Sequence, residues 1–416
     1  MRPLRTLTRR SIGALAAASV AGRARAAPTL TVPMRIGVLT ELGGPYAEDS
    51  GRGSVAAARF AVEDFWRQQP GLAPNFTVEV VSADAQTKPD VAAAVAGAWY
   101  DRDGVDMIID VPVSNCALAV AGVARSRNKV AIFNTSTSDL TGKACSPNHV
   151  HWAFDTYALS ASTARAMLAD GGDTWFLIQT DYTFGAVLAA EAAAVVQGGG
   201  GRMLGTVRHP FPGTTDFSSY LLAAQASGAK VIGLANAGAD AANCIKQAAE
   251  FGLTGGGVRL AALQCLLPSI HGIGAEAAQG LYLTESFYWD ADAGTRAFSD
   301  RFAHAMPGTR PCMIHAGCYA GVLHYLKAVA SLGPEAARAD GAAVVAEMKR
   351  LPTDDPLFGK GRIREDGRKI HDMHLYRVKP PAASHGSWDL YDLVRTTPGE
   401  QAFRPVGEGG CPLVCS

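Results

Sequence analysis

The chain has 416 residues, of which 48% are hydrophobic and 18% are charged. This composition indicates a folded protein with a large core and excludes a disordered chain. The 38 basic and 38 acidic residues cancel, and they form no basic stripe of the kind that binds nucleic acid. No apolar run after Ala27 reaches the roughly 18 residues of a membrane span, so we expect a soluble mature protein.

The first 27 residues have the pattern of a bacterial export peptide. A basic head with four arginines precedes the short apolar run Ser11–Gly22, and Ala24–Ala26 supplies an A-x-A cleavage signal. We therefore assign residues 1–26 as a signal peptide and expect export. The Thr8–Ile12 core, which contains Arg9 and Arg10, favours the twin-arginine route, with the general secretory route as the alternative.

The chain then alternates between apolar β-type runs and Ala-rich helical stretches. Strands are predicted at residues 34–40, 75–83, 105–111 and 130–134, with helices between them. The pattern restarts with strands at 174–179, 202–208, 231–235 and 259–263, separated by helices at 185–197, 216–227 and 239–251. Continuous apolar strands between helices indicate parallel sheets covered on both faces. The fold class is therefore α/β, with two doubly wound units.

The last quarter of the chain departs from this rhythm. Helices are predicted at residues 297–306, 316–331 and 341–350. Residues 361–363 and 369–378 then flank Arg364–Gly367, whose Asp-Gly pair is typical of a β-hairpin turn. We expect residues 398–416 to be irregular and held by their cysteines.

Eight cysteines in an exported protein indicate disulfides rather than a metal or redox site. No C-x-x-C pair is present. The preferred bridges join consecutive strand–helix units, namely Cys116 with Cys145 and Cys244 with Cys265. The pairing of Cys312, Cys318, Cys411 and Cys415 stays open.

Several loops that follow strands carry side chains suited to ligand binding, since ligands of open α/β sheets bind beyond the carboxyl ends of the strands. Residues 40–48 include Tyr46, residues 112–116 include Ser114 and Asn115, and residues 134–139 include Thr135 and Ser136. The hydroxyl and amide side chains at these helix starts fit N-capping. The same helix starts also attract a carboxylate or another oxyanion.

Catalytic and metal-binding patterns are weak. The sequence contains no Gly-x-Ser-x-Gly elbow, no Walker-type loop and no strand-linked G-x-G-x-x-G. His371 and His374 would face opposite sides of a strand, which disfavours a metal site. We predict no enzyme activity, no cofactor and no metal.

The chain resembles the periplasmic solute-binding proteins of ABC transporters, in the leucine/isoleucine/valine-binding branch with the type I fold. The resemblance covers roughly residues 34–398 and rests on the ordered segments MRIGVLTELGGPYA, VVSADAQTKPD, QTDYTFG, AAEFGL and EAAQGLYLTESFYWD, and on the stretch from Val113 to Asn148. It implies two doubly wound parallel-sheet lobes joined by three crossovers, with residues 33–153 plus 286–350 in the first lobe and 154–285 plus 351–397 in the second. It also implies a periplasmic location, a small-molecule ligand, an ABC permease as the membrane partner, and a monomer.

Carried over by motif, the ligand contacts fall on Tyr46, Ser114, Asn115, Thr135 and Ser136 in the first lobe, and on Asp155, Tyr157, Phe184, Asn236 and Gln264 in the second. Where amino-acid-binding members place an acidic residue for the ligand ammonium, this chain has Gln264. An ammonium without an anionic partner in a closed cleft is costly. The predicted ligand is therefore a small amine-free carboxylate or aromatic compound. Asp155 remains a candidate ammonium partner, and the alternatives are an amino-acid ligand or a ligand-sensing regulator on the same fold.

Overall fold

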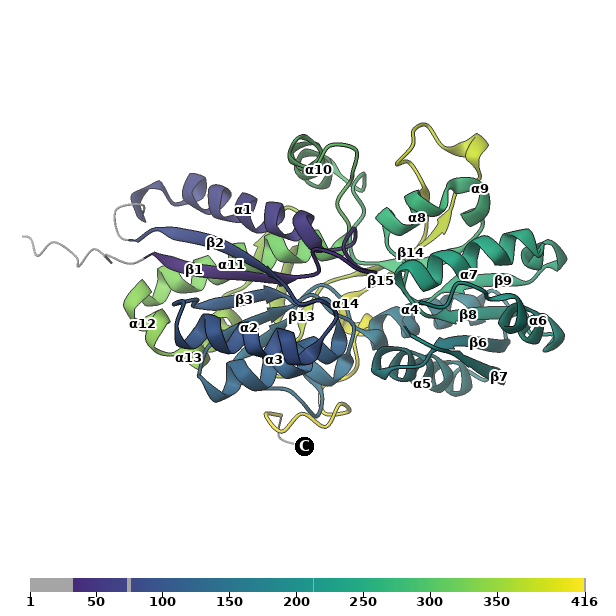
Figure 1. Cartoon of the computed structure of the whole chain (residues 1–416), viewed down its shortest axis with the longest axis horizontal. Coiled ribbons are helices and arrows are strands. Elements are labelled where there is room, and N and C mark those ends of the chain that lie inside the picture. Colours follow the sequence, from purple (N-terminus) through teal and green to yellow (C-terminus); the bar gives the residue numbers. More distant parts are fainter. Residues whose placement is uncertain (1–32, 73–75, 212, 415–416) are drawn as a thin grey trace, which may run out of the picture.

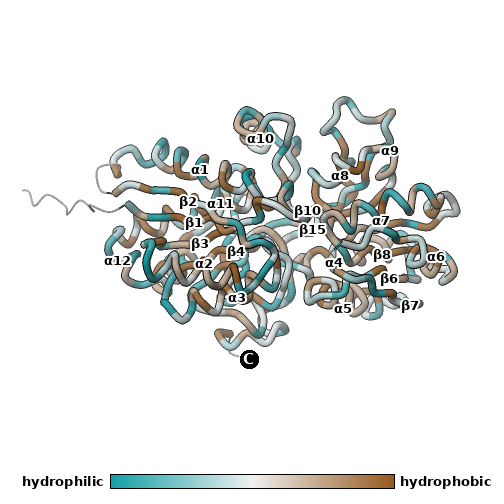
Figure 2. Tube along the Cα trace, in the orientation of Figure 1, coloured by the Kyte–Doolittle hydropathy of each residue, from teal (hydrophilic) through white to brown (hydrophobic). Residues whose placement is uncertain are grey.

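The computed structural model describes residues 33–72, 76–211 and 213–414. Two α/β lobes lie side by side, and the chain passes between them in the middle of the molecule (Figure 1). The hydrophobic residues concentrate along the strands and the inner sides of the helices of each lobe (Figure 2). The export-peptide prediction lies outside the described residues.

The first lobe is built on a parallel five-stranded sheet in the order β2-β1-β3-β4-β5. Its strands are β1 (Met34–Thr40), β2 (Val78–Asp84), β3 (Met107–Asp110), β4 (Val130–Phe133) and β5 (His149–His151). Helix α1 (Gly51–Gln68) packs on α11 (Met313–Leu332), and α2 (Pro89–Asp101) packs on α3 (Ser114–Ser126). Further helices of this lobe are α10 (Ala293–Ala305), α12 (Pro334–Ala339) and α13 (Gly341–Arg350), with the 3-10 turns η1 (Pro70–Leu72) and η2 (Ser138–Thr141).

The second lobe is built on a seven-stranded sheet in the order β15-β14-β10-β9-β8-β6-β7. The parallel strands are β6 (Thr174–Thr180), β7 (Arg202–His209), β8 (Val231–Ala235), β9 (Arg259–Ala262) and β10 (Tyr282–Glu285). The antiparallel strands are β14 (Met373–Val378) and β15 (Tyr391–Thr397). The helices are α4 (Thr156–Ala169), α5 (Thr183–Gly198), α6 (Ser218–Ala226), α7 (Gly238–Glu250), α8 (Leu267–Ile273) and α9 (Ala275–Ala278), with the 3-10 turns η3 (Leu253–Gly256) and η4 (Pro381–Ala383). The predicted α/β fold class, with two doubly wound lobes, is confirmed.

The predicted hairpin at Arg364–Gly367 is present, but the long strand predicted after it is split in two. Strands β11 (Thr353–Asp355), β12 (Gly359–Ile363) and β13 (Lys369–Ile370) form a small antiparallel sheet that contacts α13. The chain leaves strand conformation at His371 and Asp372 and re-enters it as β14 in the second sheet. The strands of residues 353–370 therefore lie in this small sheet against α13, outside the seven-stranded sheet.

The C-terminal tail contains the short helix α14 (Gly399–Ala402) and ends in turns. Cys411 in this tail forms a disulfide with Cys145 of the first lobe, with their Cα atoms 5.5 Å apart. The predicted bridges Cys116–Cys145 and Cys244–Cys265 are therefore wrong. The thiols of Cys116, Cys244 and Cys265 are free and buried, because these residues pack in the cores of the lobes as small apolar side chains.

Within the described ranges, no helix is long and apolar enough to cross a membrane. In the same part of the chain no group of three or more His, Cys, Asp or Glu side chains is arranged to hold a metal ion.

Candidate functional site

The two lobes touch through the loop between β1 and α1 and the loops at the carboxyl ends of the second sheet. The Tyr46 hydroxyl hydrogen-bonds the Tyr182 hydroxyl at 2.7 Å. Tyr46 belongs to the first lobe, and Tyr182 stands between β6 and α5 of the second. Gly238, at the start of α7, lies so close to the first lobe that a Cβ there would be 2.7 Å from the Pro45 carbonyl oxygen. The lobes are thus in contact across this part of their junction.

Two further polar contacts cross the junction. The Ser136 hydroxyl, which follows β4, donates to Gln264 Oε1 at 2.6 Å. The Ser269 hydroxyl on α8 lies 3.3 Å from both carboxylate oxygens of Asp49. Burial raises the pKa of Asp49 to about 7, since a carboxylate without a cationic partner is poorly stabilised away from water.

The loop between β3 and α3 carries backbone strain. Asp110 and Val111 both have positive φ, at 87° and 53°, and a β-branched residue there is an outlier. Such strain persists only where the surroundings enforce it, and it gathers at functional sites. This turn leads into Ser114 and Asn115 at the start of α3, and Ser114 is buried. The strain thus lies in the turn that leads directly into this helix start.

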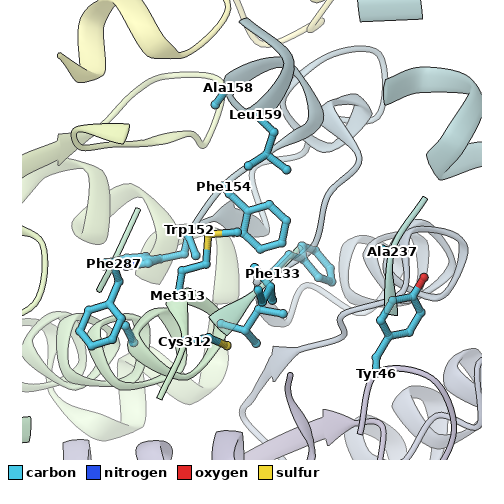
Figure 3. Close-up of a cluster of buried hydrophobic side chains, with 14 of the residues drawn as sticks. Tyr46, Phe133, Trp152, Phe154, Ala158, Leu159, Ala237, Phe287, Cys312 and Met313 are labelled. Atoms are coloured by element: carbon cyan, nitrogen blue, oxygen red, sulfur yellow. The ribbon is translucent and has the colours of Figure 1, made fainter. Parts of the chain in front are cut away.

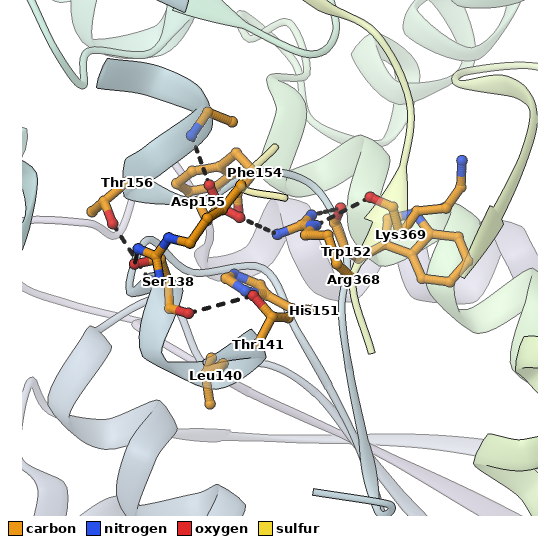
Figure 4. Close-up of polar contacts among 12 residues, drawn as sticks. Ser138, Leu140, Thr141, His151, Trp152, Phe154, Asp155, Thr156, Arg368 and Lys369 are labelled. Carbon is orange, nitrogen blue, oxygen red and sulfur yellow. Dashed lines mark hydrogen bonds and ion pairs between the residues drawn. The ribbon is translucent and has the colours of Figure 1, made fainter. Parts of the chain in front are cut away.

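Asp155 lies at the crossover between β5 and α4, and both of its oxygens are engaged (Figure 4). One oxygen caps α4 by accepting from the Ala158 amide at 2.7 Å, and the other lies 3.3 Å from the Arg368 guanidinium. Arg368 is completely buried and also donates to the carbonyl oxygens of Trp152, Phe154 and Lys369. Burial lowers the pKa of Arg368 to about 10, which leaves it charged at neutral pH. Asp155 therefore stabilises the crossover between β5 and α4, and both oxygens of its carboxylate already have partners within the protein.

The second lobe presents a buried polar group beyond β7 and β8. Asn236 Nδ2 lies 3.3 Å from His209 Nε2, and His209 Nδ1 lies 3.7 Å from Asp240 Oδ2. Asn236 Oδ1 and Asp240 Oδ2 are buried without a hydrogen-bond partner among the described residues.

The remaining predicted site residues lie in two different environments. Phe184, fully buried in the first turn of α5, packs against Tyr182 with ring centroids 5.6 Å apart. Thr135 donates its hydroxyl to the Pro112 carbonyl at 2.8 Å, so that hydroxyl is already used. Tyr157 lies under the guanidinium groups of Arg165 and Arg404, which places it beside the tail.

The sequence interpretation missed several residues at the junction. Thr137, which is not among the predicted ligand contacts, has a buried hydroxyl with no partner within the described chain. Tyr182, Gly238, Asp240 and Ser269 were also missed. The QTDYTFG segment and the predicted contact Asn236 identified the right loops, but only the packing shows which side chains cross between the lobes.

A cluster of buried apolar side chains includes the crossover between β5 and α4 (Figure 3). Phe133, Trp152, Phe154 and Met313 are fully buried there, and Phe287 is nearly so. The cluster joins the end of β4, the crossover between β5 and α4, and the start of α11. This crossover is therefore packed against apolar side chains.

Comparison with known proteins agrees with this two-lobe arrangement. The family described as periplasmic binding protein matches residues 33–386. The chain belongs to the periplasmic binding protein family. Periplasmic binding proteins of this family are also its structural neighbours, whereas no curated protein sequence matches it.

A periplasmic binding protein from Burkholderia mallei is 42% identical, with a TM-score of 0.85 over 92% of this chain and 99% of that one. A protein from Burkholderia xenovorans, described as a branched-chain amino acid ABC transporter periplasmic ligand-binding protein, is 39% identical, with a TM-score of 0.82 over 91% of this chain and 99% of that one. A solute-binding protein from R. palustris in complex with benzoate is 18% identical, with a TM-score of 0.77 over 92% of this chain and 100% of that one. The last similarity shows the fold alone.

Proposed function

We propose that this protein is exported to the periplasm, captures a small organic ligand between its two lobes and delivers it to an ABC transporter permease. The observation that carries the proposal is the meeting of polar side chains from both lobes, with Tyr46 on Tyr182 and Ser136 on Gln264. A ligand that binds between the two lobes contacts both of them only in the closed form. Its binding therefore stabilises the closed form.

We further propose a small amine-free carboxylate or aromatic compound as the ligand. Gln264 presents a neutral amide at the junction, and the Asp155 carboxylate is held by Arg368 and by the start of α4. The start of α3, with Ser114 and Asn115, suits a carboxylate, because free backbone N–H groups and the helix dipole favour negative charge. The benzoate-bound relative shows that this fold accommodates such an acid.

An amino acid is the second candidate, and Asp240 favours it. This carboxylate is buried and has an oxygen without a hydrogen-bond partner among the described residues. Its charge is near enough to Tyr46 to raise the pKa of that phenol, although burial is the larger cause. The Burkholderia xenovorans relative carries a branched-chain amino acid description.

Calorimetry on the ligand-free protein separates these candidates. Benzoate, 4-hydroxybenzoate, leucine and valine are titrated into the wild type, into Asp240→Asn and into Asp216→Asn, an exposed control in the same lobe. The amine-free proposal expects the aromatic acids to bind and Asp240→Asn to retain their affinity. Leucine or valine binding that is lost in Asp240→Asn and kept in Asp216→Asn would contradict it. If none of the four compounds binds, the ligand class is wrong.

Export is tested separately from ligand binding. Cell fractionation of the wild type should find the mature protein in the periplasm, cleaved after Ala26. Replacing Arg9 and Arg10 by Lys should block export by the twin-arginine route. Normal export of the Lys pair would assign the general secretory route. A protein retained in the cytosol would favour a ligand-sensing regulator.

A further inference from the structure

The C-terminal tail connects the two lobes a fourth time. Strand β15 belongs to the second sheet, and α14 contacts α4 of the second lobe, where Arg165 donates to the Gln401 carbonyl at 2.8 Å. Ten residues later, Cys411 is bonded to Cys145 of the first lobe. The tail is packed tightly there, because a Cβ on Gly142 would lie 2.6 Å from the Gly409 carbonyl oxygen.

Arg404, midway along this tail, reaches both lobes. Its guanidinium donates to the Ser138 hydroxyl of the first lobe at 2.8 Å and forms an ion pair with Glu191 on α5 of the second lobe. Ser138 also donates to Glu191 at 2.5 Å. The side chains of Arg404 and Glu191 are 23% and 11% exposed. An ion pair sheltered to this degree is screened less by salt than one on an open surface.

The backbone of Arg404 is fixed to the side of the first lobe. Its carbonyl accepts from Arg364 at 2.8 Å, in the hairpin of the small sheet beside α13, and the disulfide lies seven residues further along the chain. Glu191 moves with α5 and the second lobe. Opening the lobes at this point separates Ser138 from Glu191, and the Arg364 hydrogen bond and the disulfide hold Arg404 with Ser138, while its guanidinium also lies over the Tyr157 ring of the second lobe.

We propose that the C-terminal tail is a latch: the Cys145–Cys411 disulfide anchors Arg404 to the first lobe, and its ion pair with Glu191 holds the second lobe closed. The latch is independent of which ligand the protein carries. Its effect is to shift the equilibrium of the empty protein towards the closed form, so that less of the ligand's binding free energy is spent on closing the lobes.

The test uses the ligand-free full-length protein and needs no ligand. Small-angle X-ray scattering and amide hydrogen exchange compare the wild type with Arg404→Gln, Glu191→Gln and the double variant Cys145→Ser/Cys411→Ser. Arg362→Gln is the matched control, since it breaks an exposed ion pair with Glu400 of the same tail. Mild reduction of the wild type, verified by mass spectrometry, replaces the double variant if that variant does not fold.

The latch variants should have a larger radius of gyration than the wild type and the control. Amides in Ser138–Thr141 and around Glu191 should exchange faster by about tenfold, while the cores of both lobes stay protected. Arg404→Gln and the disulfide variant should have similar effects, because both release the same contact. Unchanged scattering and exchange in all three variants would overturn the proposal, and so would free thiols at Cys145 and Cys411 in the exported wild type.

Discussion

The hydroxyl groups of Tyr46 and Tyr182 form a direct 2.7 Å hydrogen bond between the lobes, and burial raises the pKa of both phenols. Both groups therefore stay protonated at neutral pH, and one hydroxyl can donate while the other accepts. The pair connects the loop after β1 with the loop after β6. The contact between the lobes thus brings together two tyrosines that are 136 residues apart.

Tyr46→Phe and Tyr182→Phe should each destabilise the closed form by about 1 kcal/mol, the usual net contribution of a hydrogen bond. The double variant should be no worse than either single one, since one bond is lost in each case. Hydrogen exchange of residues 41–50 measures the effect. Tyr220→Phe is the control, because the Tyr220 hydroxyl makes no side-chain hydrogen bond within the described residues. Additive losses would show that the two hydroxyls act separately.

Gly238→Ala should hinder closure more than it destabilises the protein. The new Cβ would lie 2.7 Å from the Pro45 carbonyl oxygen across the junction. Gly252→Ala is a matched control, because Gly252 has a similar φ of 62° against 57° but open space around its Cα. Both variants should lose about 1 kcal/mol of folding stability from backbone strain. Only Gly238→Ala should enlarge the molecule in scattering, and equal behaviour of the pair would contradict a steric role.

Arg368→Met should destabilise the protein by about 3–5 kcal/mol, because it leaves Asp155 and three carbonyl oxygens without their buried cation. Urea unfolding measures this loss. Arg362→Gln, which removes an exposed ion pair, should cost less than about 1 kcal/mol. A loss below that value for Arg368→Met would mean that the crossover between β5 and α4 does not depend on the guanidinium.

Stability should fall as the pH rises from about 4 to 7, in part because of Asp110. Burial raises the pKa of this carboxyl group from its ordinary value of 3.8 to about 7 in the folded protein. The folded state therefore holds a proton that the unfolded state has lost. The stabilisation is fully present below about pH 4 and is lost as the pH passes 7.

Asp110→Asn tests this, since the amide cannot ionise. Urea unfolding of the variant at pH 5, 6 and 7 should have a shallower pH dependence than the wild type, by up to about 1.4 kcal/mol per pH unit. Because other buried carboxyl groups titrate in the same range, the variant should keep part of the slope. An unchanged slope would show that Asp110 ionises normally in the folded protein.

The sequence was sufficient to predict the α/β lobes, because the central strands of both sheets are buried on both faces. Residues 34–40 and 231–235 were predicted with the bounds that the structure has. Helix α13 was also predicted at its observed bounds. The short strands β5 and β10 were missed, since runs of three or four residues between loops carry almost no periodicity. The break at His371 and Asp372 was missed because these two polar residues were interpreted as part of one continuous strand.

The candidate site was predicted only at the level of loops. Loop position follows from the strand order, but the use of each side chain depends on its partner in space. Asp155 has a side chain suited to ligand binding, but its carboxylate pairs with Arg368, which lies 213 residues away in the sequence. The same limit applies to Cys145 and Cys411, which are 266 residues apart, whereas proximity in the sequence favoured other pairs.

The burial of five free cysteines has a consequence for biogenesis. Eight cysteines allow 105 complete pairings, so an unfolded chain exposed to oxidant has many wrong bridges open to it. In the folded protein the thiols of Cys116, Cys244, Cys265, Cys312 and Cys318 are sealed in the core, and thiol exchange requires access. The native bridge of Cys145 can form only once Cys411, 266 residues further along the chain, is in place. A chain that folds before it meets an oxidant is therefore protected from mispairing, because these five thiols are already buried.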